Sequence, residues 1–273
     1  MFPFVLQLNL WGPTVEVGPY TLFFFLAAAT VLVGGLWLAK RRGFNVRQVG
    51  WVMAAMLLAA LVGARGLNAL VNLQSYLAEP ARFWEVSVSG FSLYGGVLAA
   101  LAAGYAVCRV LKIDAFRLGD TLVPFLGIGV ALMRVGCFLR GCCFGVETDL
   151  PWGVRFPMLS PAHLHQMAEH GNFLEVIAVH PTQLYEMFFA LLLTGLAFRG
   201  LSRKWPTGVV MVMFLTYFSL FRLVNYFLRV NPEGFSVPAY FYPGIYLLLF
   251  VTGVIILRRI KKLQVKTANE QTI

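Results

Sequence analysis

The chain has few charged side chains for its size. Asp, Glu, Lys and Arg make up 12% of its 273 residues, and only 12 residues are acidic. Hydrophobic residues make up 59%, and the mean hydropathy is +0.75. A typical soluble domain is about 25% charged. This composition excludes an ordinary soluble domain and indicates an integral membrane protein.

Positive charge is also missing from the beginning of the chain. Residues 1–19 contain no Lys or Arg, so they lack the charged start of a cleavable signal peptide. The first apolar run is followed directly by the basic triplet at 40–42, and we expect it to remain as an uncleaved anchor. Phe2, Phe4 and Trp11 favour an outer interfacial segment over 1–19, because aromatic rings are favoured at membrane interfaces.

Seven long apolar runs are present, and most reach the ~20 residues that a helix needs to cross the hydrocarbon core. Runs of this length satisfy their backbone hydrogen bonds in lipid only as helices. We therefore predict an all-α polytopic membrane protein with seven transmembrane helices. The predicted spans are Tyr20–Ala39, Val49–Leu73, Phe91–Val110, Leu118–Phe138, Thr182–Phe198, Thr207–Leu228 and Ala239–Leu257.

The basic residues predict the orientation. Fifteen of the 22 Lys and Arg residues lie on the side where the odd-numbered spans end and the even-numbered spans begin. Four lie on the opposite side, and the other three lie within the spans. Because cytoplasmic loops are enriched in Lys and Arg, the N-terminus is predicted to be outside (periplasmic) and the C-terminus cytoplasmic. The same rule explains the net charge of +10 without a nucleic-acid partner.

The sequence lacks an internal repeat, a low-complexity tract and a linker between domains. We therefore predict a single integral membrane domain over residues 1–273. Its longest outward loop is expected at 140–180, and a basic cytoplasmic tail at 259–273.

Three arginines, Arg65, Arg134 and Arg222, interrupt the predicted spans. A guanidinium does not lose its proton, so it is costly at membrane depth unless an anionic or strongly polar group meets it. A lipid phosphate is one such group. Glu186, inside the fifth span, is costly for the same reason, and a buried arginine is its natural partner.

Three segments near the predicted outer face combine polar residues with glycines. Arg134 precedes a Gly- and Cys-rich turn that ends at Gly145 and is suited to an anion, although an arginine there can also extend to the interface. The second segment is Tyr94-Gly95-Gly96, in which the paired glycines allow close approach of either a helix or a ligand. The third segment is His180-Pro181-Thr182-Gln183-Leu184-Tyr185-Glu186.

The sixth span carries a polar stripe, in which Arg222, Asn225, Tyr226 and Arg229 have the spacing of one helix face. Such a stripe is expected to face protein or a water-filled cavity.

The cysteines leave several interpretations open. Cys142 and Cys143 with two of the loop histidines (His163, His165, His170, His180) can form a zinc site, but the spacing fits no standard pattern. Cys137, Cys142 and Cys143 can also act in redox chemistry, although no C-x-x-C is present. Small buried residues are the default interpretation. We therefore predict no metal and no cofactor.

Together these segments resemble the bacterial prolipoprotein diacylglyceryl transferase family. The most specific pieces run from Met133 to Gly145 and from His180 to Glu186. The other pieces are Tyr20, Gly63-Ala64-Arg65, Tyr94-Gly95-Gly96 and Phe221-Arg222 with Arg229.

The resemblance implies a multi-pass enzyme of the bacterial inner membrane with its active site towards the outer leaflet. The enzyme would transfer the diacylglyceryl group of phosphatidylglycerol to the lipobox cysteine of prolipoproteins, releasing glycerol 1-phosphate. The resemblance implies catalytic roles for Arg134, Arg222, Tyr94, His180 and Glu186. It implies phosphatidylglycerol binding by Arg134, Arg222, Tyr20, Arg65, Gly95, Gly96, Cys137, Gly145, Gln183, Tyr185 and Arg229.

Members of the family carry His where this chain has Tyr94, Asn where it has Cys137 and an acidic residue where it has Tyr226. If that His is the base, then Tyr94, His180 or Glu186 replaces it here, or the base is the peptide or water. Two other functions fit the buried charges and cysteines: a transporter or flippase for an anionic solute or lipid, and an intramembrane thiol oxidoreductase. Transporter folds commonly contain repeats, and none is visible here.

Overall fold

The computed structural model describes residues 6–9, 14–79, 93–171, 175–230 and 240–270. The chain forms two compact units. One unit combines Met1–Gly34 with Leu122–Ile273, and the other is Gly35–Thr121. Each unit is described by itself below.

The first unit begins with a β-hairpin. Strands β1 (Leu6–Asn9) and β2 (Thr14–Val17) pair antiparallel, with Leu6 opposite Val17. These strands were not among the elements predicted from the sequence, although apolar and polar residues alternate in both segments, as is typical of β-strands. Phe2, Phe4 and Trp11, which favoured an interfacial segment, lie outside the described residues.

Helix α1 (Pro19–Ala29) follows the hairpin and continues through a π-helical turn, η1 (Thr30–Gly34). Proline at the first helical position explains the start of α1, because it has no N–H to leave unpaired. Glycines of α6 (Ala115–Arg140) allow this segment to pack closely. A Cβ at Gly136 would lie 2.9 Å from Phe23 Cβ, and one at Gly129 would lie 2.7 Å from a Val31 methyl.

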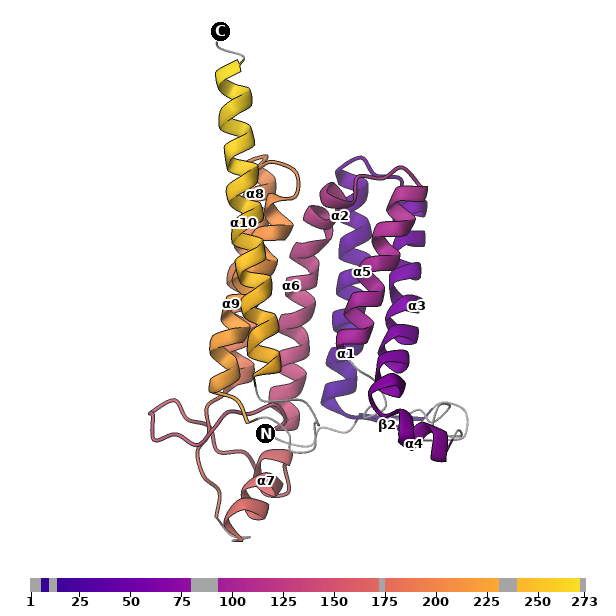
Figure 1. Ribbon diagram of the computed structural model, residues 1–273. Coiled ribbons are helices and arrows are strands. Elements are labelled where there is room, and N and C mark those ends of the chain that lie inside the picture. Colours follow the sequence, from indigo (N-terminus) through magenta and orange to yellow (C-terminus); the bar gives the residue numbers. More distant parts are fainter. Residues whose placement is uncertain (1–5, 10–13, 80–92, 172–174, 231–239, 271–273) are drawn as a thin grey trace. The chain divides into compact units, whose positions relative to one another are not determined.

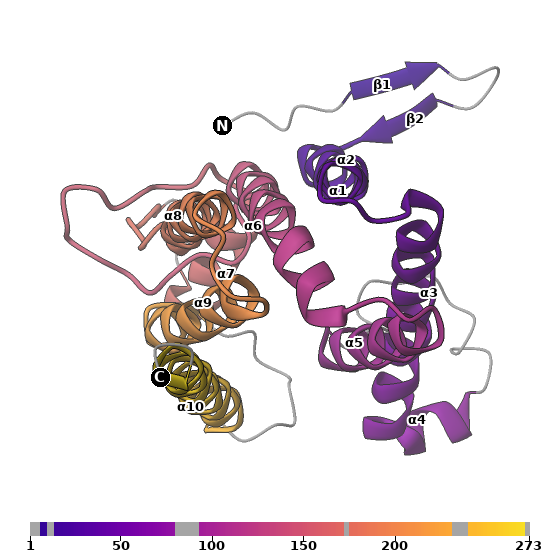
Figure 2. The same cartoon turned by 90° about the horizontal axis from the view of Figure 1, so that it is seen from above.

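Three further helices complete the helical part of the first unit: α8 (Thr182–Ser202), α9 (Val209–Phe227) and α10 (Phe241–Glu270). Helix α9 lies between α8 and α10 (Figure 2). The core joins α6, α8 and α9 through Val123, Leu193, Ala197, Val210, Met213 and Phe214.

The segment between α6 and α8 lies at one end of these helices and contains α7 (Pro161–His170) (Figure 1). Ser160 caps α7 by accepting a hydrogen bond from His163 N, and Gly171 ends it in the left-handed conformation. Val179 bridges to Glu147 and Val154. Phe144, Phe156, Ala162 and Val179 form a second small core.

The second unit contains α2 (Gly35–Arg41), α3 (Val46–Val71), α4 (Leu73–Ala78), α5 (Leu93–Val110) and the first residues of α6. Asn45 caps α3 through hydrogen bonds from Arg47 N and Gln48 N. Helices α3 and α5 pack against each other at Gly63 and Gly95.

Among the described residues, six helices are long and apolar enough to cross a membrane. They are Pro19–Arg41, Val46–Val71, Ala115–Arg140, Thr182–Ser202, Val209–Phe227 and Phe241–Lys262. A seventh apolar helix, Gly95–Val110, is shorter. The prediction of a polytopic α-helical membrane protein is confirmed, whereas seven spans and the orientation remain predictions.

Candidate active site

Glu186 joins two partly buried arginines in the first unit. Arg134 Nη2 lies 2.9 Å from Glu186 Oε1, and Arg222 Nη1 donates a hydrogen bond to Oε2 at 2.9 Å. The three side chains come from α6, α8 and α9. The predicted pairing of Glu186 with a buried arginine is therefore confirmed, with two arginines in place of one.

The charges of this triad do not cancel. One carboxylate meets two guanidinium groups, which leaves one net positive charge. The Glu186 side chain is 3% exposed, whereas those of Arg134 and Arg222 are 20% and 19% exposed. The carboxylate is thus enclosed, while each arginine keeps a surface for another partner. Arg134 Nε is buried and has no hydrogen-bond partner among the described residues.

Tyr246, on α10, is part of the same arrangement and was not among the predicted site residues. Arg222 Nη2 donates a hydrogen bond to the Tyr246 hydroxyl at 2.7 Å, and the guanidinium lies over the ring, 5.3 Å from its centroid. Arg222 is therefore held from two sides, by Glu186 and by Tyr246. No local pattern around Tyr246 indicated this contact, because it joins two helices across a long loop.

The loop after α6 is held by the first turn of α8. Gln183 Nε2 donates to the Cys142 carbonyl and Thr182 Oγ1 donates to the Cys143 carbonyl, both at 2.8 Å. Gln183 and Thr182 are buried. The loop turns through left-handed residues, Gly141 with φ 74° and Cys143 with φ 63°. A non-glycine residue in this conformation is strained, so the surrounding hydrogen bonds hold it there.

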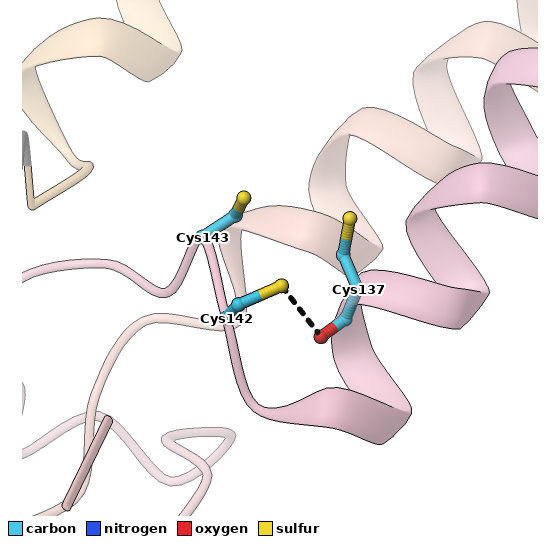
Figure 3. A group of neighbouring side chains, drawn as sticks. All are labelled: Cys137, Cys142 and Cys143. Atoms are coloured by element: carbon cyan, nitrogen blue, oxygen red, sulfur yellow. Dashed lines mark hydrogen bonds between the residues drawn. The ribbon is translucent and has the colours of Figure 1, made fainter. Parts of the chain in front are cut away.

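This loop brings three cysteines together. The sulfur atoms of Cys137, Cys142 and Cys143 all lie within 4.8 Å of one another (Figure 3). Cys137 Sγ is also 3.8 Å from Arg134 Nη1. Hydrogen bonds from the thiols of Cys137 and Cys142, together with the charges of Arg229 and Arg134, lower the pKa of the Cys143 thiol. Hydrogen bonding with Cys137 and Cys143 raises the pKa of Cys142.

Gly145 is tightly enclosed. Its N–H donates to the His180 carbonyl at 2.8 Å, and it forms a β-bridge with Arg229. A Cβ at this position would lie 2.5 Å from both His180 Cβ and the Leu228 carbonyl oxygen. The bridge also corrects a prediction. Helix α9 ends at Phe227, so Arg229 lies beyond the helix and not on its polar face, because its backbone pairs with the loop.

Arg229 remains next to the site despite this correction. Its Nε is buried and has no hydrogen-bond partner among the described residues. The same holds for Asn225 Oδ1 and Gln183 Oε1. Buried polar atoms are nearly always hydrogen-bonded, so these atoms are suited to a polar ligand.

His180 and Tyr185 contact each other within the predicted motif. His180 Nδ1 lies 3.1 Å from the Tyr185 hydroxyl, which also accepts a hydrogen bond from Trp152 Nε1 at 2.8 Å. Because Trp152 uses the hydroxyl as an acceptor, the hydroxyl proton is free to go to His180. Tyr20, at the start of α1, lies under Arg140, whose guanidinium is 5.5 Å from the ring centroid.

Four predicted site residues belong to the second unit: Arg65, Tyr94, Gly95 and Gly96. Arg65 is buried on α3, with its guanidinium 5.8 Å from the Tyr76 ring centroid. Gly95 and Gly96 face α3, where added Cβ atoms would meet Gly63 and Ala60. This is the helix-packing interpretation of paired glycines. The Tyr94 side chain lies outside the described residues, and ligand roles for all four stay predictions.

The zinc hypothesis required two of the loop histidines to lie beside Cys142 and Cys143. Among the described residues, the histidines are not part of the cysteine group. In the described part of the chain, the group around Cys142 and Cys143 is completed by Cys137. His163 is buried, and its Nδ1 accepts a hydrogen bond from Leu159 N. His170 pairs with Glu147 at 2.7 Å.

Comparison with known proteins decides the family. The model of the family described as prolipoprotein diacylglyceryl transferase matches residues 7–259. The chain belongs to this family.

Relatives named phosphatidylglycerol–prolipoprotein diacylglyceryl transferase occur in several bacteria. The Geobacter sulfurreducens protein is 32% identical over 201 residues, covering 70% of this chain and 69% of the relative. The Synechococcus elongatus protein is 30% identical over 230 residues (80% and 77%). The Clostridium tetani protein is 26% identical over 198 residues (72% and 74%).

Proposed function

We propose that this protein transfers the diacylglyceryl group of phosphatidylglycerol to the lipobox cysteine of prolipoproteins, with glycerol 1-phosphate as the second product. The observation that carries the proposal is the triad of Arg134, Glu186 and Arg222. The family and the names of its members support the same reaction and favour it over a transporter or flippase.

The triad fits the charge that develops in this reaction. The acceptor sulfur attacks the glycerol carbon, the carbon–oxygen bond breaks, and its electron pair passes to the phosphate oxygen. Arg134 and Arg222 stabilise that charge from fixed positions, where cations in a site of low dielectric are most effective. Glu186 holds both arginines and leaves the net positive charge that a phosphate requires.

Other residues of the first unit have supporting roles in this proposal. The buried Nε of Arg229 and Oε1 of Gln183 contact the polar headgroup, and Gly145 keeps the loop against His180. Tyr20, Cys137 and Tyr185 line the phosphatidylglycerol site. Glu186 acts through the arginines and not as the base, because both of its oxygens are engaged. His180 is oriented by Tyr185. Because its Nδ1 accepts from the Tyr185 hydroxyl, its Nε2 carries the ring proton and can donate it during the transfer.

For the second unit, the family resemblance implies phosphatidylglycerol binding by Arg65, Tyr94, Gly95 and Gly96, and we keep that role for them in the proposal. Arg65 supplies a buried cation, and Gly95 and Gly96 also pack against α3. The protein crosses the bacterial inner membrane seven times, with the N-terminus outside, the C-terminus in the cytoplasm and the active site towards the outer leaflet. Its partners are phosphatidylglycerol, the membrane lipid around it and prolipoprotein signal peptides that carry a lipobox cysteine; it has no nucleic-acid partner.

A transfer assay with purified protein tests the proposal. Phosphatidylglycerol labelled in its diacylglyceryl group is supplied in vesicles with a lipobox peptide, and a peptide with Ser in place of Cys serves as the control. We expect label on the Cys peptide only. Removing one fixed cation is expected to lower the rate about 100-fold or more, so Arg134→Ala and Arg222→Ala should each abolish measurable transfer.

Arg203→Ala, an exposed arginine at the other end of α8, is the matched control and should transfer at the wild-type rate. Failure of the folded wild-type protein to label the Cys peptide would overturn the proposed function. Full activity of either Arg134→Ala or Arg222→Ala would remove that residue from the phosphate site.

A further inference from the structure

The cysteine group of Cys137, Cys142 and Cys143 is separate in chemistry from the arginine triad, although Cys137 lies next to Arg134. Cys137 stands on the last turn of α6, and Cys142 and Cys143 stand on the loop that follows (Figure 3). All three thiols are free, and their sulfur atoms lie within 4.8 Å of one another. Cys137 is buried, and the other two are partly buried.

The backbone holds this arrangement in place. Two cysteines that are adjacent in the sequence are awkward ligands for one ion. Here the backbone of the second one, Cys143, is left-handed, with φ 63°. The carbonyls of both residues are fixed by Gln183 and Thr182, and Cys142 N donates to the Cys137 carbonyl at 3.1 Å. Strained backbone of this kind persists only where its surroundings enforce it, and it clusters at functional sites.

The sulfur spacing suits a tetrahedral metal ion. With metal–sulfur distances of about 2.3 Å, two sulfur ligands of such an ion lie about 3.8 Å apart. The sulfur atoms lie within 4.8 Å of one another, so each pair is at most about 1 Å further apart than this value. Three thiolates and a divalent cation carry one net negative charge. Arg229, whose charge acts on Cys143, offsets it together with Arg134, which lies 3.8 Å from Cys137 Sγ. Three protein ligands with a fourth position open is the arrangement of catalytic zinc sites.

In place of the sequence-based prediction of no metal, we propose that Cys137, Cys142 and Cys143 bind a divalent cation of the zinc class, and that its fourth position takes the thiol of the acceptor cysteine. This inference rests on the proposed function, because the acceptor thiol is the substrate of that reaction. The bound thiol becomes a thiolate, since metal coordination deprotonates a thiol. The cysteine group thereby activates the nucleophile beside the arginines that hold the phosphate.

The step is balanced. The acceptor thiol releases its proton to water as its sulfur binds the cation. The sulfur electron pair then forms the bond to the glycerol carbon while the carbon–oxygen bond breaks towards the phosphate. The products are a neutral thioether, which is a weak ligand and leaves the cation, and the anionic glycerol phosphate. No electrons are gained or lost from outside, so no oxidant or reductant is required.

Metal binding is tested first, without any measurement of activity. Full-length protein is purified in micelles under reductant and without metal, and is then titrated with Co²⁺ as a spectroscopic substitute for Zn²⁺. We expect one Co²⁺ per chain, with a sulfur-to-cobalt charge-transfer band and the visible bands of tetrahedral Co²⁺. Zn²⁺ should displace it. Addition of a lipobox peptide should shift the visible bands, whereas the peptide with Ser in place of Cys should leave them unchanged.

Variants assign the ligands. The bands should disappear in the C137S/C142S/C143S protein and weaken in C143S alone, which keeps most of the loop packing. Cys108→Ser is the matched control, because Cys108 is a buried cysteine of the second unit, and it should bind as the wild type does. Circular dichroism and size-exclusion chromatography establish folding. Absence of Co²⁺ and Zn²⁺ binding by the folded protein with reduced thiols, or binding unchanged in the triple variant, would overturn the proposal.

Transfer assays separate this inference from the proposed function. A free thiol with a pKa of about 8.5 is only a few per cent ionised near neutral pH, so loss of the metal should lower the transfer rate about 30-fold. Wild-type transfer by the triple variant would overturn the metal site and leave the transferase standing. Arg222→Ala should lose transfer but keep the Co²⁺ spectrum, because Arg222 contacts Glu186 and Tyr246 and not the cysteines. If no folded protein labels the peptide although Co²⁺ binds, the proposed function fails instead.

Discussion

The hydroxyl of Tyr246 accepts a hydrogen bond from Nη2 of Arg222 at 2.7 Å, while the other terminal nitrogen, Nη1, donates to Glu186. Tyr246→Phe removes this contact and keeps the ring beneath the guanidinium. A hydrogen bond to a charged group contributes about 1.5–3 kcal/mol, so we expect phosphatidylglycerol transfer to fall about tenfold to 100-fold. Steady-state kinetics with varied phosphatidylglycerol measure the change.

Tyr217→Phe is the matched control for this variant, because Tyr217 is an exposed tyrosine on α9. It should retain the wild-type rate. Equal rates for Tyr246→Phe and Tyr217→Phe would show that Arg222 does not depend on the Tyr246 hydroxyl for its position.

Glu186 is expected to stabilise the fold as well as the site. Glu186→Gln leaves two guanidinium groups close together without a counter-charge. Breaking a buried ion pair by removing one partner costs about 3–5 kcal/mol, and partial exposure of the arginines reduces this to about 2–3 kcal/mol. Thermal unfolding in micelles should show a lower Tm. The double variant E186Q/R222M should recover part of the loss, and an unchanged Tm in Glu186→Gln would contradict this account.

Gly145 tests the close packing of the loop. An added methyl would lie 2.5 Å from His180 Cβ and from the Leu228 carbonyl oxygen. Such overpacking typically costs about 1–3 kcal/mol, so Gly145→Ala should unfold at a lower temperature. Gly195→Ala on α8 is the control, because an added Cβ there meets no atom within 4 Å. It should have an equal or higher Tm, and equal destabilisation of the two variants would argue against close packing at Gly145.

His170 and Glu147 provide a prediction about pH outside the membrane spans. The hydrogen bond to Glu147 at 2.7 Å raises the pKa of His170 above its usual 6.5, and the charges of Glu147, Glu169 and Glu175 act in the same direction. The protonated form is therefore favoured by folding. Its contribution is fully present below the unfolded-state pKa and is lost as the pH rises through the folded-state pKa.

NMR titration of histidine-labelled protein measures this pKa directly. Glu147→Gln should lower the pKa of His170 towards 6.5, and Glu79→Gln, a substitution in the second unit, should not change it. A His170 pKa that is the same in Glu147→Gln and in the wild type would contradict the pairing.

The helices were predictable because hydropathy acts over long windows, and most predicted spans agree with the observed helices to within a few residues. The pairing of Glu186 was predictable as well, because a buried carboxylate requires a cation. The polar stripe was partly wrong. Periodicity placed Arg229 on a helix face, but the pairing of its backbone with Gly145 ends α9 earlier.

Other features depend on contacts or backbone angles that a sequence does not contain. The contact of Tyr246 with Arg222 joins two helices, and neither has a local signal for it. The cysteine group depends on the left-handed backbone of Cys143, which is unusual for a residue other than glycine. By contrast, the alternating pattern of 6–9 and 14–17 is a signal that could have predicted the hairpin.

Binding of phosphatidylglycerol by Arg134 and Arg222 is the central claim, and native mass spectrometry of protein released from mixed-lipid nanodiscs tests it most directly. The wild type and Arg203→Ala should each retain one phosphatidylglycerol in preference to phosphatidylethanolamine. The R134A/R222A protein should lose this preference while remaining folded. Equal retention of phosphatidylglycerol by the wild type and R134A/R222A would contradict the account.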